Sequence, residues 1–276
     1  MSIGSGRRYP DKLKEMPWEA RVFQTTVNSR TFSRRSLHGQ VAHKIAMRII
    51  SGEINPGDYL STEEAASSDL KISRTAYREA LKVLAAKGLV ESRPKTGTRV
   101  RSRSEWNMLD PDLLAWSFET GPSETFARSL FEFRQIIEPA AAAIAAERAD
   151  ADEIRTMKNA IEAMKSAGED HLQWVEADLA FHLSVLEATH NELLTSFGYL
   201  VESALAQSFE LSDRKPGARN LSLPRHVQLY EFIAARDSAG AQSTMLQLLK
   251  EARRDLEDVI SAGIPARTNR KRNPVA

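Results

Sequence analysis

The chain has 276 residues, of which 42% are hydrophobic and 27% charged, and this composition is ordinary for a globular protein of two compact domains. No run approaches the roughly 20 consecutive apolar residues that a membrane helix needs, so no membrane partner is expected. Cysteine is absent, which excludes disulfides, thiolate zinc sites and cysteine nucleophiles and fits a cytoplasmic location.

The net charge of +1 is unevenly distributed along the chain. Residues 1–104 hold 20 Lys and Arg against 10 Asp and Glu, whereas the remainder holds 18 against 27. A basic segment joined to an acidic one indicates a polyanion-binding module coupled to a domain with another task. A chance skew of surface charge is the alternative explanation.

The first third of the chain predicts a winged helix-turn-helix. Apolar residues recur at helical spacing over 39–50, and the Ser-Thr-Glu-Glu run at 61–64 has the cap hydroxyl and the acids of a helix start. A third helix opens on Ser73 and ends at Gly88, and two short strands follow, with Gly97 near the tip between them.

The third helix carries the clearest indication of function. Arg74 and Arg78 lie four residues apart and share one helix face, opposite an apolar stripe. Such a helix suits the major groove of DNA, where arginine pairs with guanine or holds phosphate. The predicted DNA-binding residues are Ser73, Arg74, Thr75, Tyr77 and Arg78 on the helix and Lys95, Thr96, Gly97 and Thr98 in the wing.

Beyond residue 103 strand alternation disappears and long helical periods take over, so the predicted fold class is mainly α. After a short helix that starts at Pro111, helices are predicted at about 123–148, 150–166, 170–190, 191–211, 223–236 and 238–262. The predicted segments are a disordered arm at 1–36, the winged helix-turn-helix at 37–103, a linker with a connecting helix at 104–121, an all-helical domain at 122–264 and a basic disordered tail at 265–276.

Two polar groups stand out in the helical domain. Asp178 and His182 lie four residues apart on one helix face, a spacing that can bring both to one metal ion, and an ordinary helical Asp–His pair is the alternative. Arg134 lies in an otherwise apolar helix, one turn before Glu138. Arginine suits bidentate recognition of a carboxylate, and an ion pair with Glu138 is the competing explanation.

These residues resemble those of the GntR family of bacterial repressors. The winged-helix pattern of the family is matched by the turn at 52–57, the helix at 73–81 and the wing at 97–100. The helical remainder resembles the FadR-type (FCD) ligand domain through residues 132–140, Asp178 to His182, and His226. A longer match at 93–116 is similar to sugar-acid repressors of the family, such as those of galactonate operons.

The resemblance implies a transcriptional regulator, a repressor of a catabolic operon, that binds operator DNA as a homodimer. Its all-helical domain would serve effector binding and dimerisation, with a small organic acid such as a sugar acid as effector. The implied effector-binding residues are Arg134, Asp178, His182 and His226, and the last three would also hold a zinc- or nickel-like ion. A domain that senses another organic acid or a metal ion remains an alternative.

The chain departs from the family pattern at two places. The family has Pro-Ser-Glu-Arg at the start of the second helix, where the arginine touches DNA, and here the run at 61–64 ends in Glu64. That contact is therefore lost, and Glu64 is expected to repel phosphate. The fourth metal ligand of the family, a histidine, falls on Leu248, which cannot ligate an ion.

An enzyme is the remote alternative. Asp178, His182 and His226 with an open coordination position could activate water on a metal ion. No general base is evident beside them, and the chain lacks a phosphate-cradling glycine loop and a G-x-S-x-G elbow. Together with the DNA-reading module, these absences predict that the protein is not an enzyme.

Overall fold

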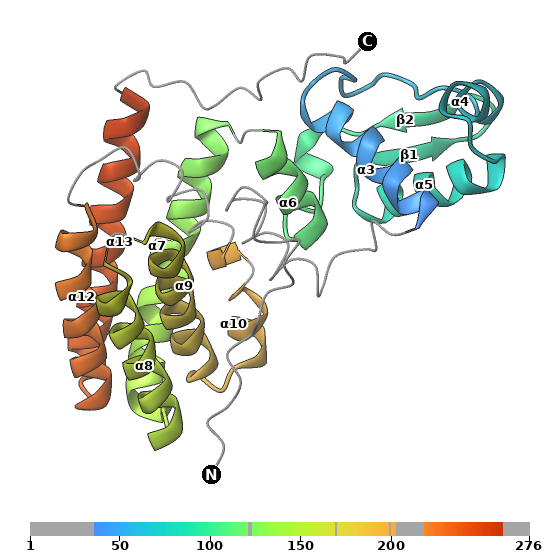
Figure 1. Cartoon of the computed structure of the whole chain (residues 1–276). Coiled ribbons are helices and arrows are strands. Elements are labelled where there is room, and N and C mark those ends of the chain that lie inside the picture. The colour runs from blue at the N-terminus through green and yellow to red at the C-terminus, as the bar shows by residue number, and fades with distance from the viewer. Residues whose placement is uncertain (1–35, 121–122, 169, 199, 203–217, 262–276) are drawn as a thin grey trace. The chain divides into compact units, whose positions relative to one another are not determined.

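The computed structural model of the chain describes residues 36–120, 123–168, 170–198, 200–202 and 218–261 (Figure 1). The described residues fall into two units, one within 36–129 and the other within 130–259, and each is described by itself. The predicted disordered arm, apart from Ser36, and the predicted basic tail lie outside the described residues.

The first unit is a winged helix-turn-helix, as predicted. Its elements are α3 (Leu37–Ile50), α4 (Glu63–Leu70), α5 (Arg74–Ala86), β1 (Val90–Arg93), β2 (Gly97–Val100), the 3-10 helix η2 (Arg103–Glu105) and α6 (Pro111–Glu119). Ser36, Thr62 and Ser73 begin the first three helices, and each side chain accepts a backbone N–H of its first turn. β1 and β2 pair antiparallel, and Tyr59 bridges to Arg99 on the free side of β2.

Helix α6 packs into the core of this unit, although the sequence predicts it as part of a linker. Leu113 and Trp116 are buried with the apolar faces of α3 and α5. Lys87, just after α5, is also buried, and its ammonium donates to Asp110 at 2.8 Å and to Asp112 at 2.5 Å. Apolar and ionic contacts therefore pack α6 against the winged helix, and the unit that contains both runs to Ser129.

Gly88 allows a close backbone approach between the end of α5 and η2. Its φ is +77°, and a Cβ there would lie 2.6 Å from the backbone oxygen of Glu105. Gly52 has a similar φ of +80°, but nothing lies within 4 Å of the position that its Cβ would take. An alanine at Gly52 would therefore suffer backbone strain alone, whereas an alanine at Gly88 would suffer strain and a steric clash.

We expect Gly88→Ala to lower the free energy of unfolding by about 3 kcal/mol or more, because strain and overpacking each cost about 1–3 kcal/mol. Gly52→Ala is the matched control and should cost only the strain, about 1–2 kcal/mol. Urea denaturation of both variants measures the difference. Equal losses of stability would contradict the close approach at Gly88.

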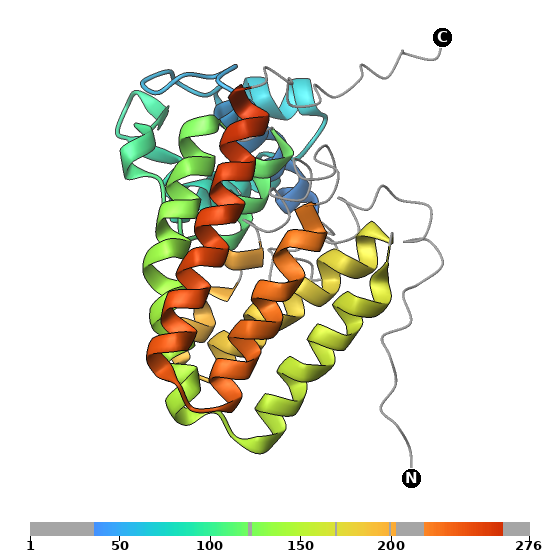
Figure 2. The same ribbon diagram turned by 90° about the vertical axis from the view of Figure 1, so that its left-hand side faces the viewer.

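The second unit is a bundle of helices around one apolar core. Its elements are α7 (Glu124–Arg148), which begins in the first unit, α8 (Ala151–Ala167), α9 (His171–Glu187), α10 (Glu192–Ser196), α12 (Ala218–Ala234) and α13 (Ser238–Ser261). Small side chains on α7 let its neighbours approach closely, and the buried ones are Ala141, Ala142, Ala145 and Ala146. Figure 2 shows α13 lying along α7, where Arg253 faces Glu132 at 3.8 Å.

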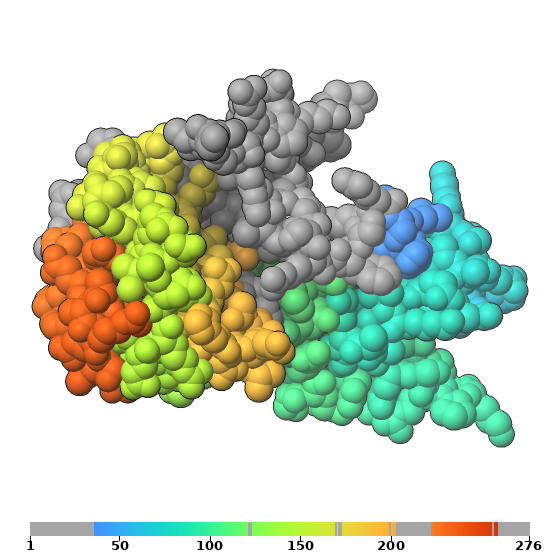
Figure 3. Space-filling view, turned by 90° about the horizontal axis from the view of Figure 1, so that it is seen from below, coloured from blue at the N-terminus to red at the C-terminus, as the bar shows by residue number. Residues whose placement is uncertain are grey.

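Two arginines join the helix junctions at one end of this bundle. The Arg148 guanidinium at the end of α7 donates to the carbonyl of Thr189, after α9, at 2.9 Å. Arg236, between α12 and α13, donates to the carbonyl of Ala146 at 3.2 Å. Figure 3 shows this end of the bundle, with the orange-red, lime and yellow-orange surfaces of the three junctions side by side. These bonds satisfy carbonyls that the helix ends would otherwise leave unpaired.

One predicted helix is interrupted. The sequence predicts a single helix over 191–211, but α10 ends at Ser196 and Phe197 is its C-cap. The Phe197 ring packs edge-on against Phe133 of α7, with ring centroids 5.3 Å apart. Residues 203–211 of the predicted helix lie outside the described residues. Among the described helices, none combines the length and the hydropathy that crossing a membrane requires.

Candidate functional site

The exposed start of α5 and the tip of the wing form the candidate DNA-reading surface. Ser73, Arg74, Thr75 and Arg78 are exposed, and the Ser73 hydroxyl accepts the backbone N–H of Ala76 at 3.1 Å. The wing residues Lys95, Thr96 and Gly97 are exposed and Thr98 is half-buried. The structure thus leaves most of the predicted DNA-binding side chains accessible.

Tyr77 is the exception, because its side chain is buried and not accessible to DNA in this structure. It is only 2% exposed, and its hydroxyl donates to the carbonyl of Ser61 at 3.0 Å. Tyr77 lies three and seven residues before Ala80 and Leu84, so it shares their buried helix face. Its role is to fix α5 against the start of α4.

Two acids of α4 contact the arginines of α5. The Arg78 guanidinium forms a bidentate pair with Glu63, at 3.0 and 2.7 Å, and Arg74 lies 2.9 Å from Glu64. The hydrogen bond from Arg78 is the main cause that lowers the pKa of Glu63. Sequence reasoning treated Glu64 only as a source of repulsion and missed its pairing with Arg74. All four side chains are at least one-third exposed, so the pairs add little to stability.

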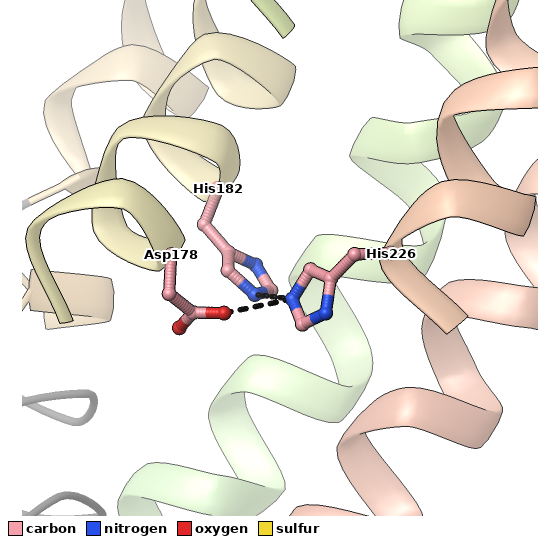
Figure 4. A group of neighbouring side chains, drawn as sticks. All are labelled: Asp178, His182 and His226. Carbon is pink, nitrogen blue, oxygen red and sulfur yellow. Dashed lines mark hydrogen bonds and ion pairs between the residues drawn. The ribbon is translucent and has the colours of Figure 1, made fainter. Parts of the chain in front are cut away.

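The second unit holds a buried cluster of five polar side chains from three helices. Arg134 and Glu138 come from α7, Asp178 and His182 from α9, and His226 from α12, and all are buried. Figure 4 shows Asp178, His182 and His226 directed toward one point between α9 and α12. The structure therefore brings together the four predicted effector-binding residues and adds Glu138 to them.

The two histidines are each fixed by a hydrogen bond on the ring nitrogen that faces away from the other. The Nδ1 atom of His226 lies 2.9 Å from the carbonyl oxygen of Ser222, and the Nδ1 atom of His182 lies 2.6 Å from Glu138. Both partners are acceptors, so each Nδ1 atom donates to its partner. On a neutral ring this places the lone pair on Nε2, the atom that could bind an ion. This is the arrangement that usually orients metal-binding histidines.

The donor atoms are spaced as ligands of one ion would be. The Nε2 atom of His226 lies 2.8 Å from Asp178 and 3.4 Å from the Nε2 atom of His182, and all three donors lie within 4.8 Å of one another. Donors that bind one ion at 2.0–2.2 Å are about 3–3.5 Å apart. Burial by itself would raise the pKa of Asp178, but the nearby His226 holds it below its usual range, so the carboxylate is ionised. The three residues therefore fit a divalent cation.

Glu138 links the histidine cluster to Arg134. Its Oε1 atom accepts from the Nε atom of Arg134 at 2.5 Å, and its Oε2 atom accepts from His182. Burial opposes ionisation, yet Arg134 and His182 together lower the pKa of Glu138 to about 2. Sequence reasoning foresaw the Arg134–Glu138 pair but not the contact with His182, which lies 44 residues along the chain.

Arg134 keeps part of its hydrogen-bonding capacity unused. Its side chain is 1% exposed, and the Nη1 atom has no hydrogen-bond partner in the described part of the chain. A buried unpaired donor of a charged group is costly, so the position favours an anionic ligand. Leu248 of α13, the position of the fourth family ligand, is buried in the apolar core and offers no donor atom.

Two family models match the chain. The model of bacterial regulatory proteins of the gntR family matches residues 37–100, and the FCD domain model matches residues 129–251. The first range covers the winged helix from α3 to β2, and the second contains all five residues of the buried polar cluster.

The chain is similar over most of its length to curated transcriptional regulators. The chain is 29% identical to the galactonate operon transcriptional repressor of Escherichia coli over 78% of this chain and 94% of that protein. It is 32% identical to the HTH-type transcriptional regulator LutR of Bacillus subtilis, over 77% and 96%. The solved structure of Lar, which controls expression of the Listeria monocytogenes agr system, shares the fold with a TM-score of 0.52 at 19% identity, over 82% of this chain and 99% of that one.

These matches agree with the two units described above. They confirm the predicted winged helix followed by an FCD-type helical domain, and they confirm a regulator rather than an enzyme. The chain belongs to the GntR family of bacterial regulatory proteins, and it is a DNA-binding transcriptional regulator with an FCD effector domain.

Proposed function

We propose that the protein represses a catabolic operon and releases its operator when a sugar acid enters the FCD domain. The observation that carries this proposal is the unpaired Nη1 atom of buried Arg134 beside the Asp178–His182–His226 cluster. An arginine fork suits a carboxylate, and a cation or imidazoles suit the hydroxyls next to it. The similarity to a galactonate operon repressor supports an aldonate as the acid.

We propose further that Asp178, His182 and His226 hold a divalent cation of the zinc or nickel type. Such an ion would supply positive charge and open coordination positions to oxygen atoms of the effector. Three protein donors leave such positions open, and Leu248 supplies no fourth donor. The charges of Arg134 and Glu138 cancel in their ion pair. The two positive charges of the ion would then exceed the single negative charge of Asp178, and the net positive charge would favour an anionic effector.

On DNA the regulator would act as a homodimer. A single winged helix reads one half-site, and a two-fold symmetric operator is matched by a two-fold symmetric protein. Effector binding shifts such a dimer only if the acid binds the DNA-binding state and the released state with different affinity. The coupling free energy between two such sites is typically about 1–3 kcal/mol.

An effector titration tests the proposal. The full chain, dialysed against zinc or nickel, is bound to a duplex that it has enriched from a randomised pool, and aldonates, lactate and citrate are added in turn. We expect an aldonate to release the DNA at the lowest concentration. His226→Ala should lower the metal content found by elemental analysis and raise the acid concentration needed. Release by no acid, or the same release by the His226 variant, would contradict the proposed site.

A further inference from the structure

The recognition arginines of this chain are not free to meet DNA as simple cations. Arg74 and Arg78 are each paired across the helix-turn-helix with an acid of the first turn of α4, namely Glu64 and Glu63. The four charges cancel at the start of the recognition helix. Each guanidinium group at this point therefore has a carboxylate in direct contact with it.

The backbone around the two acids is fixed, but the ion pairs themselves are weak. Thr62 caps α4 by accepting the backbone N–H of Ala65 at 3.3 Å, and buried Tyr77 donates to the carbonyl of Ser61, so the backbone that carries both acids is fixed against α5. Because the pairs are solvent-exposed, breaking them costs little. The arginines can therefore turn to a better acceptor, whereas the backbone that carries the two acids stays fixed next to the start of α5.

A G·C base pair offers hydrogen-bond partners to both the arginine and the acid. In the major groove guanine presents the acceptors O6 and N7, which match an arginine fork, and the paired cytosine presents an N4 amino donor, which matches a carboxylate. A phosphate satisfies the arginine alone and repels the acid. In an A·T pair, adenine presents only the acceptor N7 next to its N6 amino donor, so it does not match an arginine fork.

We propose that Glu63 and Glu64 are specificity-determining residues of the DNA interface. Each Arg–Glu pair selects a G·C pair in the operator and disfavours contact with the phosphate backbone alone. The acids thus lower the affinity for DNA of unrelated sequence more than the affinity for the operator. This inference rests on Arg74 and Arg78 facing DNA, which alanine variants of the two arginines test separately.

The test compares Glu63→Gln and Glu64→Gln with the wild type on two probes. One probe is a pool of random-sequence duplexes, and the other is a duplex enriched by the wild-type protein. Each variant is expected to bind the random pool about tenfold more tightly, with the salt dependence steeper by about one released counterion. Its affinity for the enriched duplex should rise much less, so the ratio of the two affinities falls.

Glu162→Gln on α8 is the matched control, because Glu162 is an exposed acid paired with Lys165 at 3.0 Å in the other unit. A ratio that stays at the control value overturns the proposal, and so does an equal rise on both probes, since the acids would then only repel DNA. Enrichment repeated with each Gln variant gives an independent readout. Loss of one G·C preference in each half-site is expected, and unchanged preferences would overturn the proposed reading of base pairs. Urea denaturation first confirms that the variants fold.

Discussion

Arg74→Ala and Arg78→Ala are each expected to weaken binding to an enriched operator duplex by about tenfold to a hundredfold. Both arginines lie on the exposed face at the start of α5, and a base contact or a charged phosphate contact is worth about 1–3 kcal/mol. Mobility-shift titrations at fixed salt measure the loss. Because both side chains are exposed, the free energy of unfolding should stay nearly constant.

A matched control separates contact from net charge. Arg155 on α8 is an exposed arginine paired with Asp152 in the helical unit, so Arg155→Ala removes the same charge away from the recognition helix. If Arg74→Ala and Arg78→Ala both bind as tightly as this control, the assignment of α5 as the recognition helix is wrong. The salt dependence then sorts the contacts, since losing a phosphate contact lowers its slope by about one and losing a base contact leaves it unchanged.

The second large effect is expected on the response to the acid when Arg134 is substituted. The buried position of Arg134 makes lysine a better substitution than alanine for this test. Arg134 is buried against Glu138, so Arg134→Ala leaves a buried carboxylate with one partner fewer. Breaking a buried ion pair from one side costs about 3–5 kcal/mol, and urea denaturation should show this loss. Arg134→Lys keeps the positive charge but loses the planar fork that binds a carboxylate at two points.

Arg134→Lys is therefore expected to bind the operator duplex normally but to need roughly tenfold or more acid for half-maximal release, because a charged hydrogen bond is worth about 1.5–3 kcal/mol. Arg128→Lys is the control, since Arg128 lies on the same helix in an exposed pair with Glu124 at 2.6 Å. Release of Arg134→Lys at the wild-type acid concentration would show that the carboxylate is anchored elsewhere. The proposed cation would then be the anchor, and metal removal by a chelator should abolish the response.

Much of the architecture could be predicted from local patterns in the sequence. Thr62 and Ser73 cap helices where the sequence predicts helix starts, because a cap is satisfied by N–H groups two or three residues away. The spacing of Asp178 and His182 placed two polar groups on one face of α9, since helical geometry fixes the direction of residues four apart. Such features depend on neighbours within one turn of the chain.

Contacts between distant segments were decided only by the tertiary structure. The sequence predicts Tyr77 as a DNA-binding residue, but its ring lies in the core. It predicts Glu64 as a repulsive charge, but Glu64 pairs with Arg74. In the same way Glu138 joins Arg134 to His182, and the spacing along the chain gives no sign of it. The physical reason is that burial and ion pairing depend on which helix faces meet in space, and a helical period in the sequence does not specify the partner of a face.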